Sequence, residues 1–398
     1  MATDKIFTRD FILVFLAQFV LSCAYNLFVP TLPIYLSRLG SREEAIGILI
    51  GAMSVSSLAL RPLVGKALLK IPERDFMFGG ALLFALSSAA YLFAPPFWPL
   101  FIVRVIQGIG MACFYTASAT FVTKTSPEAR RGQTLGYFYL AFTFAFALAP
   151  SFGMFLINNF SFVLLFLLCT ALSLGSGFLS IRFKRSRLEP ARNPALSERP
   201  FLTLNTLPSI IVTLFANVIW GALTAFFPLY AVEQGVANPG FFFAAYAITL
   251  IVSRSLGGRM LDHYNRERMI LSCLGTFVLA TLILAFSKTL PMFLLVAVIW
   301  GIGASFLFPS LLIYTLDRVG STGGPVMGNF MAIGDLGVSL GSVIMGIVVR
   351  LTSYRVMFLS LAFTATLSLW YFYRVAKKQR GEKSGPSNGD NRVFRGSL

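Results

Sequence analysis

The sequence contains little charge. Asp, Glu, Lys and Arg together make up 12% of its 398 residues, whereas about a quarter is usual in soluble domains. Hydrophobic residues make up 56%, and 41 positions are Phe. Because so few charged side chains do not cover a water-facing surface of this size, we expect lipid to be the solvent for most of the chain.

Residues that build metal sites and catalytic centres are also scarce. The four cysteines stand singly inside apolar runs, which excludes a metal-ligand pair or a disulfide framework, and we interpret them as small buried hydrophobic residues. The only histidine, His263, follows Asp262 in a charged loop, where solvation is expected. The apolar runs contain no paired acids, and no glycine-rich phosphate loop with Lys occurs. We therefore expect no cofactor, no metal and no enzyme activity.

The net charge of +17 is distributed over short loops between apolar runs. This distribution is typical of membrane topology and argues against nucleic acid as a partner. Most Lys and Arg residues fall in loops on one side, and the other side carries only Arg38, Arg42, Lys288, Arg350 and Arg355. By the positive-inside rule, the richer side and both termini are expected to be cytoplasmic, as in a multi-pass protein of the cell (inner) membrane.

Twelve apolar runs are long enough to cross a bilayer, which takes about 20 apolar residues. They span residues 11–36, 45–69, 76–94, 97–123, 132–157, 160–182, 206–232, 239–262, 269–288, 290–316, 325–350 and 353–374. The predicted domains are a first bundle, residues 1–182, and a second bundle, residues 206–376. Residues 183–205, rich in Arg, Pro and Ser, are expected to form a cytoplasmic linker, and residues 377–398 a disordered cytoplasmic tail.

The second half of the chain repeats the first. Arg61, Gly65, Gly108, Gly110 and Gly153 recur 193 positions later as Arg254, Gly258, Gly301, Gly303 and Gly346. Leu32-Pro33-Ile34-Tyr35 with Gly40 recurs 195 positions later as Phe227-Pro228-Leu229-Tyr230 with Gly235. Duplicated membrane halves are common in alternating-access transporters, with the substrate site between the halves. We expect an all-α membrane protein with 12 transmembrane helices in two pseudo-symmetric six-helix bundles.

Two motifs identify a related family. The fourth span contains Arg104-Val105-Ile106-Gln107-Gly108-Ile109-Gly110, and the loop after the eighth contains Gly258-Arg259-Met260-Leu261-Asp262. Together they resemble the major facilitator superfamily over nearly the whole chain. In that family the loop motif latches the cytoplasmic side shut, so the resemblance implies a latch that includes Gly65, Gly258, Asp262 and Arg266. The first copy has Leu69 where the acid belongs, which weakens the latch in the first half.

Arg104 lies within the membrane by this reading. A charge there is costly and normally lines a water-filled cavity. Arg104 is only seven residues into its span, about 10 Å at helical rise, so its side chain can also extend to the interface. The second half has Ala297 and Trp300 in place of Arg104 and Gln107. Because the first-half motif is complete, we interpret Arg104 as a cation of the substrate cavity.

Asp335 is the only carboxylate near mid-membrane, about ten residues or roughly 15 Å into its span. A carboxyl group buried in low dielectric can carry a proton. The alternative is a structural or gating ion pair with Arg61, which lies at similar depth on the second span; in this fold the second and eleventh spans meet. Both roles stay open, and Arg61, Arg104 and Asp335 are the predicted proton-coupling or gating residues.

Further polar and aromatic side chains within the spans are candidates for the substrate cavity. They are Gln18, Tyr25, Asn26, Gln107, Asn217, Trp220, Tyr246 and Trp300. In the fifth span, small residues and one proline follow the intervals of the family's exporter motif, with two glycines replaced by alanine. These positions are Gly136, Ala145, Ala149, Pro150 and Gly153. Ordinary close packing of helices explains the same pattern.

The leading hypothesis is a secondary active transporter that works by alternating access: a proton-coupled antiporter for efflux of a small organic compound, drug-like, lipophilic or a metabolite. A proton-coupled uptake symporter or a facilitator is the alternative within transport. A membrane receptor or enzyme is the alternative from a different class. The expected partners are a small-molecule substrate, protons and the lipid bilayer, and we expect the chain to act as a monomer. The sequence does not identify the substrate.

Overall fold

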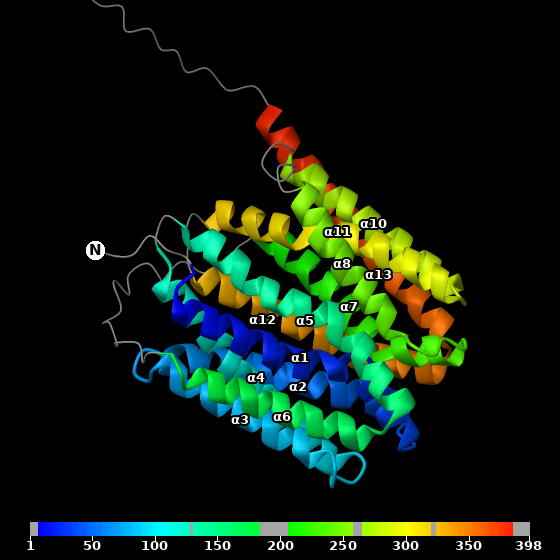
Figure 1. The fold of residues 1–398 in the computed structure, drawn as a ribbon. Coiled ribbons are helices and arrows are strands. Elements are labelled where there is room, and N and C mark those ends of the chain that lie inside the picture. Colours follow the sequence, from blue (N-terminus) through cyan, green and yellow to red (C-terminus); the bar gives the residue numbers. More distant parts are fainter. Residues whose placement is uncertain (1–6, 128–129, 184–205, 258–264, 320–323, 385–398) are drawn as a thin grey trace, which may run out of the picture.

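Twelve α-helices make up most of the described chain (Figure 1). The computed structural model describes residues 7–127, 130–183, 206–257, 265–319 and 324–384. The first half contains α1 (Arg9–Arg38), α2 (Glu43–Ala67), α3 (Glu73–Ala90), α4 (Trp98–Thr125), α5 (Arg131–Asn159) and α6 (Phe162–Ser180). The second half contains α7 (Leu207–Glu233), α8 (Gly240–Gly257), α10 (Arg266–Phe286), α11 (Leu290–Val319), α12 (Gly324–Leu351) and α13 (Tyr354–Ser384).

Within these described ranges, ten helices are long and apolar enough to cross a membrane. The other two, α3 and α8, have 18 residues each. Helix α3 also begins with the charged residues Glu73, Arg74 and Asp75. The expected series of 12 helices is present, and ten of the predicted spans are supported by length and composition.

The helices pack within each half and along seams between the halves. In the first half, α3 packs on α4 and α6, α1 on α5 and α6, and α2 on α4. In the second half, α12 packs on α7, α10 on α11 and α13, and α11 on α8. Helices α2 and α12 form one seam between the halves, and α5 and α8 form the other. We call the end where α2 and α4 terminate the basic end, after Lys66, Lys70 and Lys124, and the other the opposite end.

The sequence repeat corresponds to repeated local structure at the ends of α1 and α7. Gly40 and Gly235 follow these helices with φ of 78° and 80°, a conformation that side chains rarely adopt. Beyond each glycine, the next N–H returns to a helical carbonyl, from Ser41 to Leu36 and from Val236 to Ala231. Both helices therefore end in the same glycine-based motif, which explains why glycine occurs in both copies.

The repeated tyrosines make matching hydrogen bonds. The hydroxyl of Tyr35 donates to the carbonyl of Tyr91, at the end of α3, over 3.2 Å. The hydroxyl of Tyr230 donates to the carbonyl of Ser287, at the end of α10, over 2.6 Å. In each half the first helix is thereby tied to the third at the opposite end.

The repeated glycines of α4 and α11, Gly108 and Gly301, also have the same role in helix packing. A Cβ atom at Gly108 would collide with the carbonyl of Met53, and one at Gly301 would press on the carbonyl of Tyr246. Met53 and Tyr246 are themselves 193 positions apart. Each glycine lets the fourth helix of its half approach the second, so the repeat predicts real packing.

The structure differs from the predicted domain limits at one place. Helix α13 continues to Ser384, eight residues beyond Ala376, the expected end of the second bundle. Lys, Arg, Glu and Gln are good helix formers, and residues 377–384 are rich in them, so the helix continues past its apolar part. Residues 184–205, within the predicted linker, and residues 385–398 lie outside the described ranges.

Candidate functional site at the interface between the halves

Arg61 and Asp335 meet on the seam between α2 and α12. Arg61 Nε lies 2.8 Å from Asp335 Oδ2. The side chains are 22% and 23% exposed, so an accessible space reaches this pair within the helical body. Their contact across the boundary between the halves agrees with the similar depth in the membrane that the sequence predicts for both residues.

The contact is short but is not a well-aligned hydrogen bond. Arg61 Nε donates to Ser57 Oγ over 3.4 Å, and Arg61 Nη1 to Met331 Sδ over 3.7 Å. Among described residues, Asp335 Oδ2 has no donor in hydrogen-bonding geometry. The pair is therefore held by charge attraction, with a weak sulfur acceptor and a long hydroxyl contact beside it. The guanidinium of Arg61 and the carboxylate of Asp335 therefore retain the capacity to bind a ligand.

Two polar side chains from other helices complete this region. The phenol of Tyr25 on α1 is within electrostatic reach of Arg104, Asp335 and Arg61. The amide of Asn217 on α7 lies against Gly334, where a Cβ would be 3.5 Å from it. We call Tyr25, Arg61, Asn217 and Asp335 the central site. It draws one residue from each of α1, α2, α7 and α12.

A row of aromatic rings connects the central site to the second half. The Tyr25 ring lies 6.2 Å from Phe142, and Phe142 stacks on Phe146 at 6.3 Å. Phe146 is 5.8 Å from Trp220 and 5.9 Å from Tyr246, which are 5.1 Å from each other. We call these five residues the aromatic bridge. Tyr25, Phe142 and Trp220 are half-buried, so a ligand near the central site can contact their faces.

Arg104 borders this region, because its charge acts on Tyr25, but its side chain is bonded elsewhere. Its side chain is 6% exposed, and its Nε donates to the carbonyl of Leu49 over 2.9 Å. Its Nη1 donates to Gln107 Oε1 over 2.7 Å, and its Nη2 to the carbonyl of Ile50 over 3.2 Å. Tyr91 also donates to Gln107 Oε1. All three guanidinium nitrogens are thus bound inside the first half, an arrangement typical of a structural cation and unlike extension to the interface.

Replacing Arg104 with Ala is expected to destabilise the protein by about 1.5–3 kcal/mol, the usual value for hydrogen bonds from a charged donor. Arg104→Lys keeps the charge and one donor nitrogen, and should lose less. Unfolding of the purified protein in detergent, followed by tryptophan fluorescence, measures the difference. Exposed Arg9 provides the control as Arg9→Ala. Equal stability of Arg104→Ala and Arg9→Ala would contradict a structural role.

Four predicted cavity residues are buried within their own half. Gln18, Asn26 and Gln107 are fully buried, and Trp300 is 1% exposed and stacks on Phe277 at 4.4 Å. Gln18 accepts a hydrogen bond from Ser118, and Asn26 donates to the carbonyl of Ser22. The structure does not bring these four side chains to the central site. Tyr25, Asn217, Trp220 and Tyr246 are the predicted cavity residues that lie there or on the aromatic bridge.

Comparison with known proteins decides the family. The family model described as Major Facilitator Superfamily matches residues 14–239 and 235–396, which together are most of the chain. The chain belongs to the major facilitator superfamily. The resemblance inferred from the two motifs is thereby confirmed, and this is a family of transporters and not of enzymes.

Several members of the superfamily are similar over most of their length. The staphylopine export protein of Staphylococcus aureus is 26% identical over 372 residues, which are 89% of this chain and 91% of that protein. Quinolone resistance protein NorA of Staphylococcus aureus is 22% identical over 348 residues, 82% and 87% of the two chains. The solved structure of nucleoside transporter NupG superposes with a TM-score of 0.74 at 14% identity, over 93% and 100% of the chains, and shows the shared fold.

The superfamily's latch motif is described only in part. Gly65 has open space around its Cα, and Leu69 is 59% exposed. Gly258 and Asp262 lie outside the described residues, and Arg266 begins α10. A buried acid at the basic end of the first half is Glu73, which is 1% exposed and lies 2.6 Å from Lys124.

This Glu73–Lys124 pair was missed from the sequence, although a signal existed. The offset of 193 relates Glu73 to Arg266, and Lys124 to Asp317. The two halves therefore carry opposite signs of charge at both related positions. The positions that reveal the repeat carry identical or chemically similar residues, and a reversal of charge is neither.

The small residues of the superfamily's fifth-span motif are divided between three environments. A Cβ at Gly153 would press on the carbonyl of Leu27, so this end of α5 packs closely on α1. Ala145 and Ala149 are buried. Pro150 lies against Gly240 of α8, on the second seam between the halves, whereas Gly136 has nothing within contact distance. Close helix packing accounts for the motif from Ala145 onward.

Other contributors to the central region were also missed. Met331 lies one turn before Asp335 on α12 and accepts from Arg61. Phe142 and Phe146 follow each other at i, i+4 spacing on α5 and form the middle of the aromatic bridge. This spacing places them on one face of a helix, but 41 phenylalanines occur in the chain. Composition alone does not distinguish these two from rings that face lipid.

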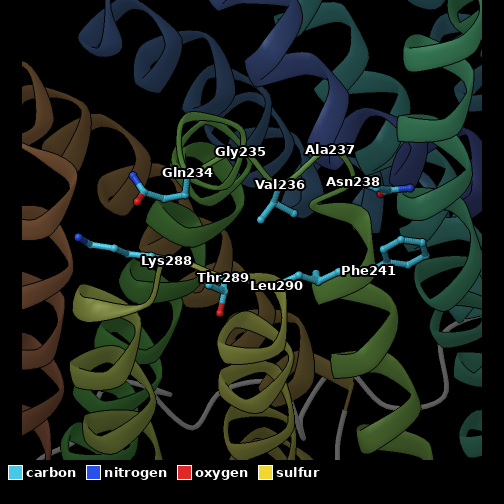
Figure 2. Close-up of a pocket in the computed structure, with 9 residues that line it drawn as sticks. All are labelled: Gln234, Gly235, Val236, Ala237, Asn238, Phe241, Lys288, Thr289 and Leu290. Carbon is cyan, nitrogen blue, oxygen red and sulfur yellow. The ribbon is translucent and has the colours of Figure 1, made fainter.

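A surface pocket of about 420 Å³ lies apart from the central site (Figure 2). The loop between α7 and α8 and the loop between α10 and α11 form it, at the opposite end. Its lining residues are Gln234, Gly235, Val236, Ala237, Asn238, Phe241, Lys288, Thr289 and Leu290. Its position in the loops of one half gives it no contact with the pair of Arg61 and Asp335.

Proposed function

We propose that this superfamily member is a secondary active transporter that exports a small organic compound in exchange for protons. Two relatives are named as a staphylopine export protein and a quinolone resistance protein. The observation that carries the proposal is the ion pair between Arg61 and Asp335. An ionisable pair between the halves links proton binding to their relative movement, and such residues within a membrane normally mark ion pathways.

The internal repeat supports a functional role for the acid. Arg61 recurs as Arg254, whereas Asp335 corresponds to Phe142 at the same offset of 193. Both related crossings, α2 with α12 and α5 with α8, pack closely. Close packing of these helices therefore does not require a carboxylate. We assign the costly, unrepeated acid to transport of the proton.

The proposed movement is alternating access of two six-helix bundles, residues 1–182 and 206–376. Within the described ranges, three side-chain polar contacts join the halves at the opposite end. Arg350 donates to Glu44, Asn158 Nδ2 donates to the carbonyl of Ala237 over 2.7 Å, and Asn238 Nδ2 donates to the carbonyl of Ser151 over 3.2 Å. With the basic end and both termini in the cytoplasm, these contacts close the external side of the inner membrane. Export requires that they separate.

Gly47 provides a test of this seam. A Cβ at Gly47 would collide with the carbonyl of Ser342 on α12, so Gly47→Val should separate the halves at the opposite end by overpacking, which costs about 1–3 kcal/mol. We expect a rise of about tenfold or more in labelling of a cysteine introduced at Ser339, by an impermeant maleimide added outside. Gly175→Val on α6, where nothing lies within 4 Å, is the matched control. Equal labelling in both variants would exclude the seam as the external gate.

For the substrate we propose a position beside the central site, against the half-buried faces of the aromatic bridge. Trp220 and Tyr246 come from the second half and Tyr25 from the first, so a ligand there touches both moving bodies. The transporter is proposed to act as a monomer, because the central site is complete within one chain.

Flux measurements in liposomes test the function. Purified protein is reconstituted, and uptake of a fluorescent quinolone is followed with and without an imposed pH gradient. Accumulation against the quinolone gradient that needs an opposing proton gradient, and that is lost when a protonophore is added, is the expected result. Accumulation in the direction of the proton gradient would instead indicate symport, and flux indifferent to pH would indicate a facilitator. Either outcome overturns the proposal.

A further inference from the structure

We infer that the central site selects an amphoteric aromatic compound, a molecule that carries one ammonium group and one carboxylate on an aromatic body. The inference rests on the proposed exchange of substrate for protons. It adds the charge class of the substrate and the two side chains that recognise it.

The first observation is that both charges of the central site are poorly satisfied by the protein. The guanidinium of Arg61 has a hydroxyl at 3.4 Å and a thioether at 3.7 Å as hydrogen-bond acceptors. Asp335 Oδ2 has a cation beside it but, among the described residues, no aligned donor. Arg104, by contrast, uses all three guanidinium nitrogens in contacts of 2.7–3.2 Å. A structural arginine in this chain is fully bonded, and Arg61 is not.

The second observation concerns the groups that face the pair. Helix α1 contributes the phenol of Tyr25, and Tyr139 of α5 and Tyr115 of α4 interact electrostatically with Arg61. The charge of Arg104 also acts on Tyr25, but all three of its guanidinium nitrogens are already bonded within the first half. Helix α7 places the neutral amide of Asn217 against Gly334, the neighbour of Asp335, and its Nδ2 donates to the carbonyl of Thr213. The central site itself therefore offers a ligand one cation, one anion and neutral hydrogen-bonding groups.

The direction in which the proton moves relative to the substrate then restricts the charge of the ligand. A simple anion would bind Arg61 and leave Asp335 without its cation, so Asp335 would take up a proton together with the anion. Substrate and proton would then move in the same direction, which is symport. Exchange requires the reverse, a substrate that binds while Asp335 is ionised and leaves when Asp335 gains a proton.

A simple cation meets this requirement at Asp335 but leaves Arg61 without a counter-ion inside the protein. An unpaired charge in low dielectric is strongly unfavourable. A ligand with both charges avoids each problem, because its ammonium replaces Arg61 at Asp335 and its carboxylate replaces Asp335 at Arg61. Protonation of Asp335 from the external side removes the partner of the ammonium and releases the ligand.

The aromatic bridge supplies the rest of the binding surface. Tyr25 belongs to both the central site and the bridge, and Phe142 and Trp220 are half-buried beside it. An aromatic ring stacks favourably on such faces, and a ring face also attracts an ammonium group. The aromatic body of the ligand therefore follows from the rings next to the pair.

A matched ligand series tests the inference on the full chain in detergent. The probes are phenylalanine, tryptophan and the amphoteric quinolone ciprofloxacin, each compared with its methyl ester, which is a cation, and its N-acetyl derivative, which is an anion. Binding is measured by calorimetry at pH 7 and by the rise in melting temperature. We expect at least one amphoteric member to bind about tenfold or more tightly than both of its single-charge derivatives. Its affinity should fall between pH 7 and pH 5.

Substitutions of Asp335 and Arg61 test whether the preference for the amphoteric ligand depends on these two residues. Asp335→Asn should remove the advantage of the amphoteric form over the anion, and Arg61→Gln its advantage over the cation. Glu233→Gln and Arg9→Gln, which remove exposed charges far from the site, should keep both. The inference is overturned if no amphoteric member exceeds its derivatives, or if the preference survives in Asp335→Asn and Arg61→Gln.

The outcome is separable from that of the proposed function. Quinolone flux that requires an opposing pH gradient, without any amphoteric preference in binding, would leave proton exchange standing and refute the substrate class. Amphoteric binding that is lost in both variants, without gradient-driven flux, would keep the site and refute export by proton exchange.

Discussion

Asp335→Asn is expected to reduce proton-driven transport to the level of protein-free liposomes while substrate exchange across the membrane continues. Asn keeps the size of the side chain and its hydrogen-bonding oxygen but does not ionise, so no proton is carried at this position. Exchange requires only that the loaded protein alternates between its two states. Radiolabelled substrate on both sides of a vesicle, with and without a pH gradient, measures the two activities in one preparation.

The control for this variant is Glu233→Gln, which removes a carboxylate from the exposed end of α7. It should keep both activities. Equal loss of exchange and of gradient-driven transport in Asp335→Asn, measured at saturating substrate, would show that Asp335 maintains the structure and would contradict a specific role in carrying the proton. Full proton-driven transport in Asp335→Asn would place the proton elsewhere.

Breaking the ion pair from one side is expected to cost more stability than removing it altogether. Arg61→Ala strands the carboxylate of Asp335, and Asp335→Ala strands the guanidinium. One-sided loss of a buried pair costs about 3–5 kcal/mol, and we expect the lower end, because each side chain is a little over a fifth exposed. The double variant leaves no stranded charge and should cost less than either single variant, so the three variants should show a coupling energy of at least about 3 kcal/mol.

The two single variants should also differ in their response to pH. When Arg61 is absent, Asp335 can relieve its isolation by binding a proton, so the penalty of Arg61→Ala should shrink as pH falls. When Asp335 is absent, Arg61 stays charged at every accessible pH, so the stability of Asp335→Ala should show no titration at this site. Chemical unfolding at pH 5 and pH 8 measures both trends. Strictly additive effects with equal pH responses would exclude a coupled pair.

Much of the helical architecture could be read from the sequence, because bilayer thickness restricts the length and composition of a span. The internal repeat also indicated particular positions at which both halves have the same local structure. Gly40 and Gly235 adopt the same left-handed conformation, and Gly108 and Gly301 meet equivalent carbonyls. In both cases a residue without a side chain is required by local geometry that both halves share.

The surroundings of individual polar residues were harder to read. Arg61 and Asp335 could be matched because depth along a helix follows directly from residue number. The partners of Arg104 could not, because they depend on which way the helix faces. A helix that is apolar on every side shows no preferred face in its sequence.

The sequence by itself therefore determined the number of helices, their depth-related positions, the duplication and the family. Rise per residue and hydrophobic length follow from local covalent geometry and from the bilayer. Only the tertiary structure decided that Arg104, Gln18, Asn26, Gln107 and Trp300 are buried within one half, while Arg61 and Asp335 meet between the halves. The rotation of each helix about its axis is set by close packing against its neighbours, and that information is distributed over the whole chain.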